Sequence, residues 1–111
     1  MAVVSTQSDD GTILNISVIG KFDITSHVSF IQAYRDKLSY YGDKLRLLSR
    51  VVVDISKVEY MDSTALGMLL ILQEKATVAN MADVVLSNCP PCIKETLKNI
   101  GADRIVKVDW S

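Results

Sequence analysis

Residues 50–72 read RVVVDISKVEYMDSTALGMLLIL, and this stretch decides the fold. The run Arg50–Ile55 is rich in β-branched residues without a polar alternation, which predicts a central strand covered on both faces. Residues 56–62 then have the composition of a loop. A helix is expected from about Ser63 to Ala79. Because residues 65–72 carry no charge, we expect most of the circumference of this helix to be buried.

The start of this helix combines a capping acid with two hydroxyl groups, Asp62-Ser63-Thr64. The first turn of a helix has unpaired N–H groups and a partial positive charge, so a phosphate on a hydroxyl there is tolerated. Taken alone, such a triplet is more often only a helix cap. Gly67 lies inside the helix at a cost of ~1 kcal/mol relative to alanine. Its expected role is to allow close approach of a strand or of a partner.

The rest of the chain alternates strands and helices without a linker or an internal repeat. This order, β-β-α-β-α-β-α-β, predicts mainly parallel pairing with right-handed crossovers and one antiparallel hairpin. We expect a single α/β domain over residues 1–111: a mixed, mostly parallel sheet of four to five strands with helices packed against it. The remaining expected elements are strands 2–4 and 12–19 around an Asp-Gly turn at 9–11, a helix capped by one of the residues 23–26 and ending near Gly42, a strand at 82–86, a helix from Pro90-Pro91 to Gly101, and a strand at 104–108.

Length and charge exclude several classes of function. The chain has 111 residues and a formal net charge of −1, which argues against a nucleic-acid backbone or an anionic membrane as the main partner. The uncharged stretch at 63–73 is too short to span a bilayer, and residues 1–10 do not resemble a signal peptide. We therefore expect a cytoplasmic location. A single histidine, His27, leaves little material for a metal site, and no cofactor is expected.

Residues 52–55 followed by Tyr60-Met61-Asp62-Ser63-Thr64-Ala65-Leu66-Gly67 resemble the signature of STAS domains, and more narrowly that of the bacterial anti-sigma factor antagonists. Gly20-Lys21-Phe22-Asp23 resembles the turn before the first helix of that family. Asn99-Ile100-Gly101-Ala102 resembles its last helix. The resemblance covers nearly the whole chain, and it departs at Ala65, where glycine is usual.

The resemblance implies a protein that switches partners and has no catalytic site of its own. Ser63 matches the serine that a serine-kinase anti-sigma factor phosphorylates. The unmodified antagonist binds this kinase and frees its sigma factor, phosphorylation ends the interaction, and a PP2C-type phosphatase reverses it. The implied partner-binding residues are Asp23, Asp62, Ser63, Thr64, Ala65 and Gly67. The free protein is expected to be a monomer.

Two alternatives remain open from the residues. The same fold serves as an accessory subunit of lipid-transport or other signalling complexes, although such modules often lack a hydroxyl after the aspartate. Cys89-Pro90-Pro91-Cys92 is a C-x-x-C at a helix start, the pattern of thiol oxidoreductases. Its position after a late strand differs from thioredoxin, so we interpret these cysteines as small structural residues.

Overall fold

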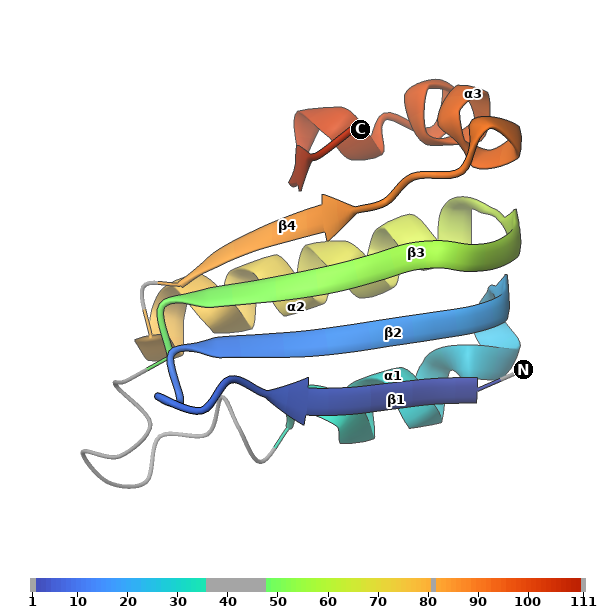
Figure 1. Cartoon of the computed structure of the whole chain (residues 1–111). Coiled ribbons are helices and arrows are strands. Elements are labelled where there is room, and N and C mark those ends of the chain that lie inside the picture. Colours follow the sequence, from blue (N-terminus) through green and yellow to red (C-terminus); the bar gives the residue numbers. More distant parts are fainter. Residues whose placement is uncertain (1, 36–47, 81, 111) are drawn as a thin grey trace.

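A computed structural model describes residues 2–35, 48–80 and 82–110 as a five-stranded sheet with helices against it (Figure 1). The strand order is β1-β2-β3-β4-β5. β1 is antiparallel to β2 and every other pair is parallel, which confirms the expected mixed, mostly parallel α/β fold. The strands are β1 (Ala2–Gln7), β2 (Ile13–Phe22), β3 (Arg50–Met61), β4 (Asp83–Ser87) and β5 (Lys107–Val108).

Helices α1 and α2 cover one face of the sheet, α1 behind β1 and β2 and α2 behind β3 and β4 (Figure 1). Helix α3 contacts β3 and lies beyond the end of β4. Under α1 three aromatic rings pack together, with centroids 5.1 Å apart for Phe22–Phe30 and 5.7 Å for Phe30–Tyr34. The helical elements are η1 (Ile24–Ser26), α1 (His27–Tyr34), α2 (Ser63–Asn80), α3 (Pro91–Ile100) and η3 (Ala102–Arg104). The expected continuation of the first helix to Gly42 lies outside the described residues.

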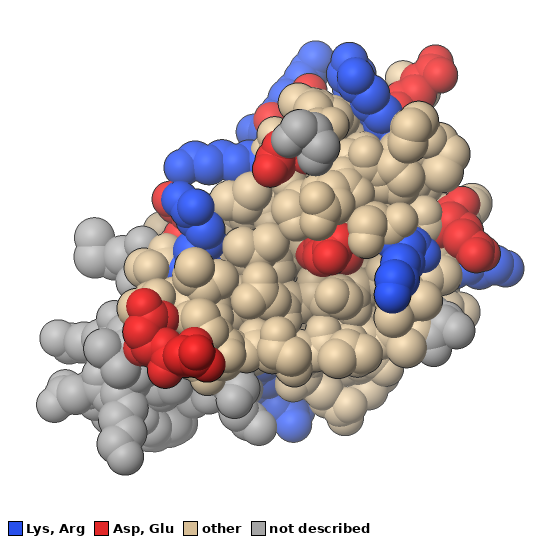
Figure 2. Space-filling model, in the orientation of Figure 1, with Lys and Arg blue, Asp and Glu red and all other residues tan. Residues whose placement is uncertain are grey.

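The central strand is buried on one face only, so the expectation that both faces are covered is wrong. Val51, Val53 and Ile55 are fully buried, whereas Val52 and Asp54 between them are half-buried. The helices lie behind one face, and the opposite face meets solvent. Figure 2 shows this open face, where charged side chains gather mostly at the rim and the middle is largely uncharged apart from an acidic group. β-branched composition alone therefore did not indicate burial of both faces.

Residues 56–61 continue β3, so the expected loop at 56–62 is wrong. β3 has two more residues than β2 over the paired length, and the register shifts between Ser17 and Ile19 and again between Gly20 and Lys21. Such β-bulges interrupt the alternation of inward and outward side chains. The buried residues of this part of β3 accordingly follow one another at intervals of three, at Ile55, Val58 and Met61. A pattern of period three does not indicate a strand by itself.

Helix α2 exposes apolar residues, and the expectation that most of its circumference is buried is wrong. Met68, Leu69, Leu72 and Ala76 pack into the core, but Leu70 and Ile71 are 44% and 42% exposed. The helix packs against β3 and β4, and among the described residues its side turned away from the sheet is exposed.

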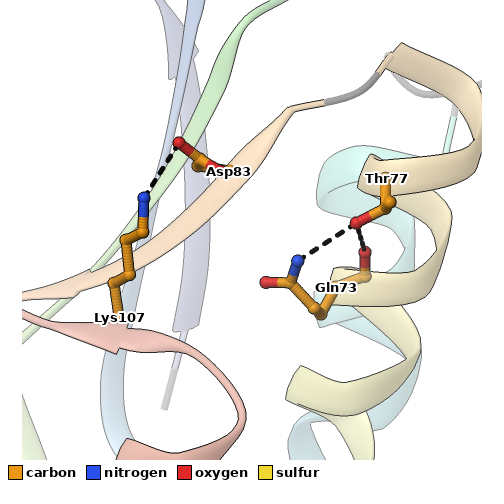
Figure 3. A network of polar contacts seen from close by, with 4 residues as sticks. All are labelled: Gln73, Thr77, Asp83 and Lys107. Carbon is orange, nitrogen blue, oxygen red and sulfur yellow. Dashed lines mark hydrogen bonds and ion pairs between the residues drawn. The ribbon is translucent and has the colours of Figure 1, made fainter.

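The C-terminal segment is fixed by a few contacts rather than by a long strand. The expected strand at 104–108 is reduced to β5, because Arg104 belongs to η3. Lys107 pairs with Asp83 of β4 at 3.1 Å (Figure 3), an exposed pair of small energetic value. In α2, shown in the same view, the Thr77 hydroxyl donates to the backbone carbonyl of Gln73 at 2.8 Å. The Trp110 ring lies against the ammonium groups of Lys94 and Lys98 of α3, 5.8 Å and 5.4 Å from its centroid.

Two neighbouring leucines of α2 test this arrangement. Leu69→Ala should lower the free energy of unfolding by about 2–5 kcal/mol, because Leu69 is fully buried and its loss leaves a cavity. Leu70→Ala should change it by less than about 1 kcal/mol, because that side chain is 44% exposed and alanine favours the helix. Urea unfolding of both variants measures the difference. Equal losses would contradict the orientation of α2.

Candidate functional site

The carboxyl ends of β2 and β3 bring two similar turns side by side. Phe22 and Met61, the last residues of these parallel strands, are paired in the sheet. Asp23 and Asp62 follow them and therefore lie at the same edge. Each aspartate carboxylate accepts the backbone N–H of the residue two positions on, Thr25 or Thr64, at 3.0 Å. Each also accepts the hydroxyl of that threonine. Open α/β sheets bind ligands and partners at this kind of edge.

Asp23 acts as a cap in the structure. Its carboxylate begins η1, and Ser26 completes a capping box by accepting the backbone N–H of Asp23 at 3.2 Å. The Ser26 hydroxyl also donates to the carbonyl of Asp23 at 2.8 Å and is fully buried. Asp23 is therefore the N-cap of η1. Its place on a partner surface remains a proposal.

Asp62 begins α2 and is held in its ionised form. The Thr64 hydroxyl has the largest effect and lowers the pKa of Asp62; desolvation opposes it, and the backbone N–H groups of Thr64 and Ala65 lower the pKa further. The Tyr60 hydroxyl donates to the second carboxylate oxygen in a long hydrogen bond of 3.4 Å. A negative charge at the N-terminus of α2 is also favoured by the helix dipole.

Ser63 and Thr64 differ in what their hydroxyl groups do. Both residues are exposed. The Thr64 hydroxyl is bound to Asp62, whereas within the described residues the Ser63 hydroxyl has no hydrogen-bond partner. Ser63 is the first residue of α2, so its hydroxyl is presented to solvent at the positive end of an 18-residue helix. Of the two hydroxyl groups, that of Ser63 is free to accept a group from outside.

The other two predicted residues of the site differ in exposure. The place of Ala65 among the partner-binding residues stays a prediction, but its side chain is fully buried and its methyl group lies in the core. The reason is the helical period, which turns position 65 toward the sheet. Gly67 is exposed, and a Cβ placed on it would meet nothing within 4 Å. A strand therefore does not approach Gly67 in the described part of the chain.

Two residues at this edge were not predicted from the sequence. Ile24 occupies the same place in the first turn that Ser63 occupies in the second, and it is 64% exposed. Tyr60 is 47% exposed and reaches the carboxylate of Asp62. The sequence did contain an indication that Ile24 is exposed. It stands between a capping aspartate and a threonine, where an apolar side chain has no role in capping. Together with Ser63, the exposed side chains of Ile24 and Tyr60 make this edge of the sheet a mixture of apolar and polar groups, as is typical of binding surfaces.

The two cysteines of the C-x-x-C sequence are free thiols that differ in exposure. Cys89 is half-buried and Cys92 is exposed, and both are free thiols. Burial raises the pKa of the Cys89 thiol, which disfavours the reactive thiolate. Among the described residues no cluster of three or more His, Cys, Asp or Glu side chains is arranged to hold a metal ion. In the same residues no helix has the length and apolarity needed to cross a membrane.

The fold and this edge define a class of small α/β domains that present a hydroxyl at the start of a helix beside a mixed sheet. The model of the STAS domain family matches residues 4–110, and the chain belongs to that family. A STAS-domain containing protein of Pseudomonas aeruginosa (strain UCBPP-PA14) is 34% identical over 109 residues, which cover 97% of this chain and 99% of that protein.

Solved structures of low sequence identity share the fold. The anti-sigma factor antagonist SpoIIAA in its unphosphorylated form matches 99% of this chain and 89% of its own, with a TM-score of 0.69 at 11% identity. An anti-sigma factor antagonist from Mycobacterium paratuberculosis matches 99% and 86%, with a TM-score of 0.73 at 20% identity. A variant of RsbS from Moorella thermoacetica matches 98% and 86%, with a TM-score of 0.71 at 20% identity.

The cap at Asp62 can be tested by stability measurements. Asp62→Ala should lower the free energy of unfolding by about 0.5–2 kcal/mol, because the Thr64 N–H loses its acceptor. Asp62→Asn should retain most of this cap, since asparagine caps helices about as well. Urea unfolding at neutral pH measures both variants. An alanine variant as stable as the natural chain would contradict the cap.

The lowered pKa of Asp62 adds a dependence on pH. Because folding lowers this pKa, the stabilisation by the charged group is complete above the ordinary value of 3.8 and is lost as the pH falls through the lower folded value. The advantage of the natural chain over Asp62→Asn should therefore shrink in acid. Unfolding curves of the two proteins on both sides of that pH provide the measurement, and a constant difference would contradict the expectation.

Proposed function

We propose that this chain is a cytoplasmic anti-sigma factor antagonist whose binding is controlled by phosphorylation of Ser63. The observation that carries the proposal is the exposed Ser63 hydroxyl, which has no partner among residues 2–35, 48–80 and 82–110, next to a Thr64 hydroxyl that Asp62 already binds. Membership of the STAS family and the likeness to structures of anti-sigma factor antagonists support the same role. In this proposal the chain is not an enzyme and binds no cofactor.

The unphosphorylated chain binds a serine-kinase anti-sigma factor, which then releases its sigma factor. The kinase transfers the terminal phosphoryl group of ATP to the Oγ of Ser63, and ADP and the proton of the hydroxyl leave. A PP2C-type phosphatase hydrolyses the ester and restores the hydroxyl. The chain contributes only the acceptor and the surface around it, which includes Asp23, Asp62 and Gly67.

Electrostatics explain how the added group ends binding without refolding the domain. The phosphate brings a charge of about −1.5 to −2 to the start of α2. There the helix dipole tolerates it, so the fold persists. Against a docked partner, however, it lies beside the charged carboxylate of Asp62, and desolvating two like charges at an interface costs several kcal/mol. Each 1.4 kcal/mol lowers affinity about tenfold.

Variants of the two hydroxyl residues test this proposal. Ser63→Ala should bind the host's purified serine-kinase anti-sigma factor as the natural chain does and should accept no phosphate. Ser63→Glu should bind at least about tenfold more weakly, because it places a charge at the contact. Thr64→Ala is the matched control and should still accept one phosphate, at Ser63. Calorimetry measures binding, and intact mass with site mapping measures phosphate.

Three results would contradict the proposal. They are phosphate mapped to Thr64, a Ser63→Ala protein that the kinase still phosphorylates, and a Ser63→Glu protein that binds like the natural chain. The same mapping on protein purified from its own host, with and without phosphatase treatment, tests the modification in the cell.

A further inference from the structure

We propose that two copies of this chain form a dimer through the open face of the sheet, in which Asp54 of each copy pairs with Lys57 of the other. The open face is the side of the sheet turned away from α1 and α2 (Figures 1 and 2). This dimer goes beyond the proposed function and does not depend on it, because Ser63 begins α2, which lies behind the other face. It replaces the monomer expected from the sequence.

The open face has the composition of an interface in the described part of the chain. Its middle carries apolar side chains from four strands. Val52 of β3 and Val85 of β4 are paired neighbours, and both are half-buried. Ile19 of β2 is half-buried, and Val4 of β1 is 51% exposed. Charged side chains gather mostly at the rim (Figure 2). An apolar centre within a polar rim is the usual arrangement of a protein interface.

A hollow of about 260 Å³ lies on this face, at the first bulge between β2 and β3. Asp54 and Lys57 both line it. The register places Asp54 beside Ser17 and Lys57 beside Ile19, so both charged residues belong to the open face. Among the described residues the Lys57 ammonium has no partner, and the Asp54 carboxylate accepts only the backbone N–H of Ser56, at 2.9 Å. Two opposite charges therefore line one hollow without binding each other.

A two-fold axis brings each of these charges to its opposite. In a two-fold dimer the same surface meets itself, so every contact occurs twice. An axis that crosses the strands midway between positions 54 and 57, parallel to the sheet, places β3 antiparallel over β3 of the second copy. Asp54 of each copy then lies opposite Lys57 of the other. An axis at position 54 would oppose two carboxylates, and one at position 57 two ammonium groups, so the charges select one register.

The packing of two sheets leaves room for these pairs. Sheets that pack face to face are about 10 Å apart, with their strands within about 30° of each other. Lys57 is a long, exposed side chain, so it can cross this gap and enter the hollow of the second copy beside Asp54. The apolar side chains around the hollow supply most of the affinity, and the charges supply the register.

The area of the open face predicts a weak dimer. Strands β1 to β4 have six, ten, twelve and five residues. At about 3.3 Å per residue and about 4.8 Å between strands, they offer roughly 500 Å² on each copy. The total of about 1,000 Å² is at the lower limit for a specific interface. We therefore expect the dimer to form at high protein concentration and to dissociate on dilution.

Reversal of either charge tests the dimer. Asp54→Lys and Lys57→Asp should each raise its dissociation constant at least about tenfold, because each variant places two pairs of like charges opposite one another. Glu95→Lys is the matched control, since it makes the same change of charge at an exposed position of α3 and should leave the dimer unchanged. Sedimentation equilibrium at protein concentrations from about 1 μM to about 1 mM measures all four proteins.

An equimolar mixture of the two open-face variants adds a test of the register. The Asp54→Lys copy carries an ammonium group at both positions and the Lys57→Asp copy a carboxylate at both. The mixed dimer therefore regains two pairs of opposite charge and should form about as well as the natural dimer, which also shows that both variants are folded. The proposal is overturned if the natural chain stays a monomer up to about 1 mM, if either variant dimerises as the natural chain does, or if the mixture stays monomeric.

Discussion

The parallel pairing of β2 with β3 is the constraint on which the rest of the molecule depends. It ends with Phe22 opposite Met61, and only this register places the two aspartate turns at one edge of the sheet. β3 reaches that register by absorbing two extra residues in bulges. A single extra residue would turn Met61 to the wrong side of the sheet, because the side-chain period of a strand is two. The second bulge restores the alternation, so that both strands end with a buried side chain over the same core.

Helix α2 carries out two tasks on opposite sides. The side of α2 that faces the sheet packs against it through fully buried residues such as Leu69 and Leu72. On the side turned away from the sheet, Leu70 and Ile71 are exposed to solvent. The hydrophobic effect favours burial of the side of α2 that faces the sheet. The apolar side chains on the opposite side stay hydrated, and burying them against another molecule would be favourable. Asp62 begins the helix and orients Thr64, which leaves Ser63 with the one hydroxyl of the pair that is available. Asp62 thus both caps the helix and, by binding the Thr64 hydroxyl, leaves the Ser63 hydroxyl as the available one of the pair.

The sequence was sufficient for features that depend on local patterns. The order of strands and helices, the cap at Asp62 and the exposed position of Ser63 follow from periodicity and capping chemistry, and the family resemblance added the role proposed for Ser63. Features that depend on how one helix or strand packs against another could not be predicted from the sequence. Whether Leu70 faces the core or solvent depends on how many elements pack around α2, and the bulges in β3 are defined only against β2. Ile24 is different, because its position between a capping aspartate and a threonine carried a signal in the sequence that was not used.

The separation of the two sides of α2 has a consequence for how such domains diverge. The exposed residues of α2 lie outside the core, so substitutions among them can alter the surface of a duplicated copy of the chain while the fold persists. At Gly67 an added Cβ would meet no atom within 4 Å, so a methyl group there leaves the packing of the domain unchanged. Paralogous pathways in one cell can in this way become insulated from cross-talk while sharing an unchanged scaffold.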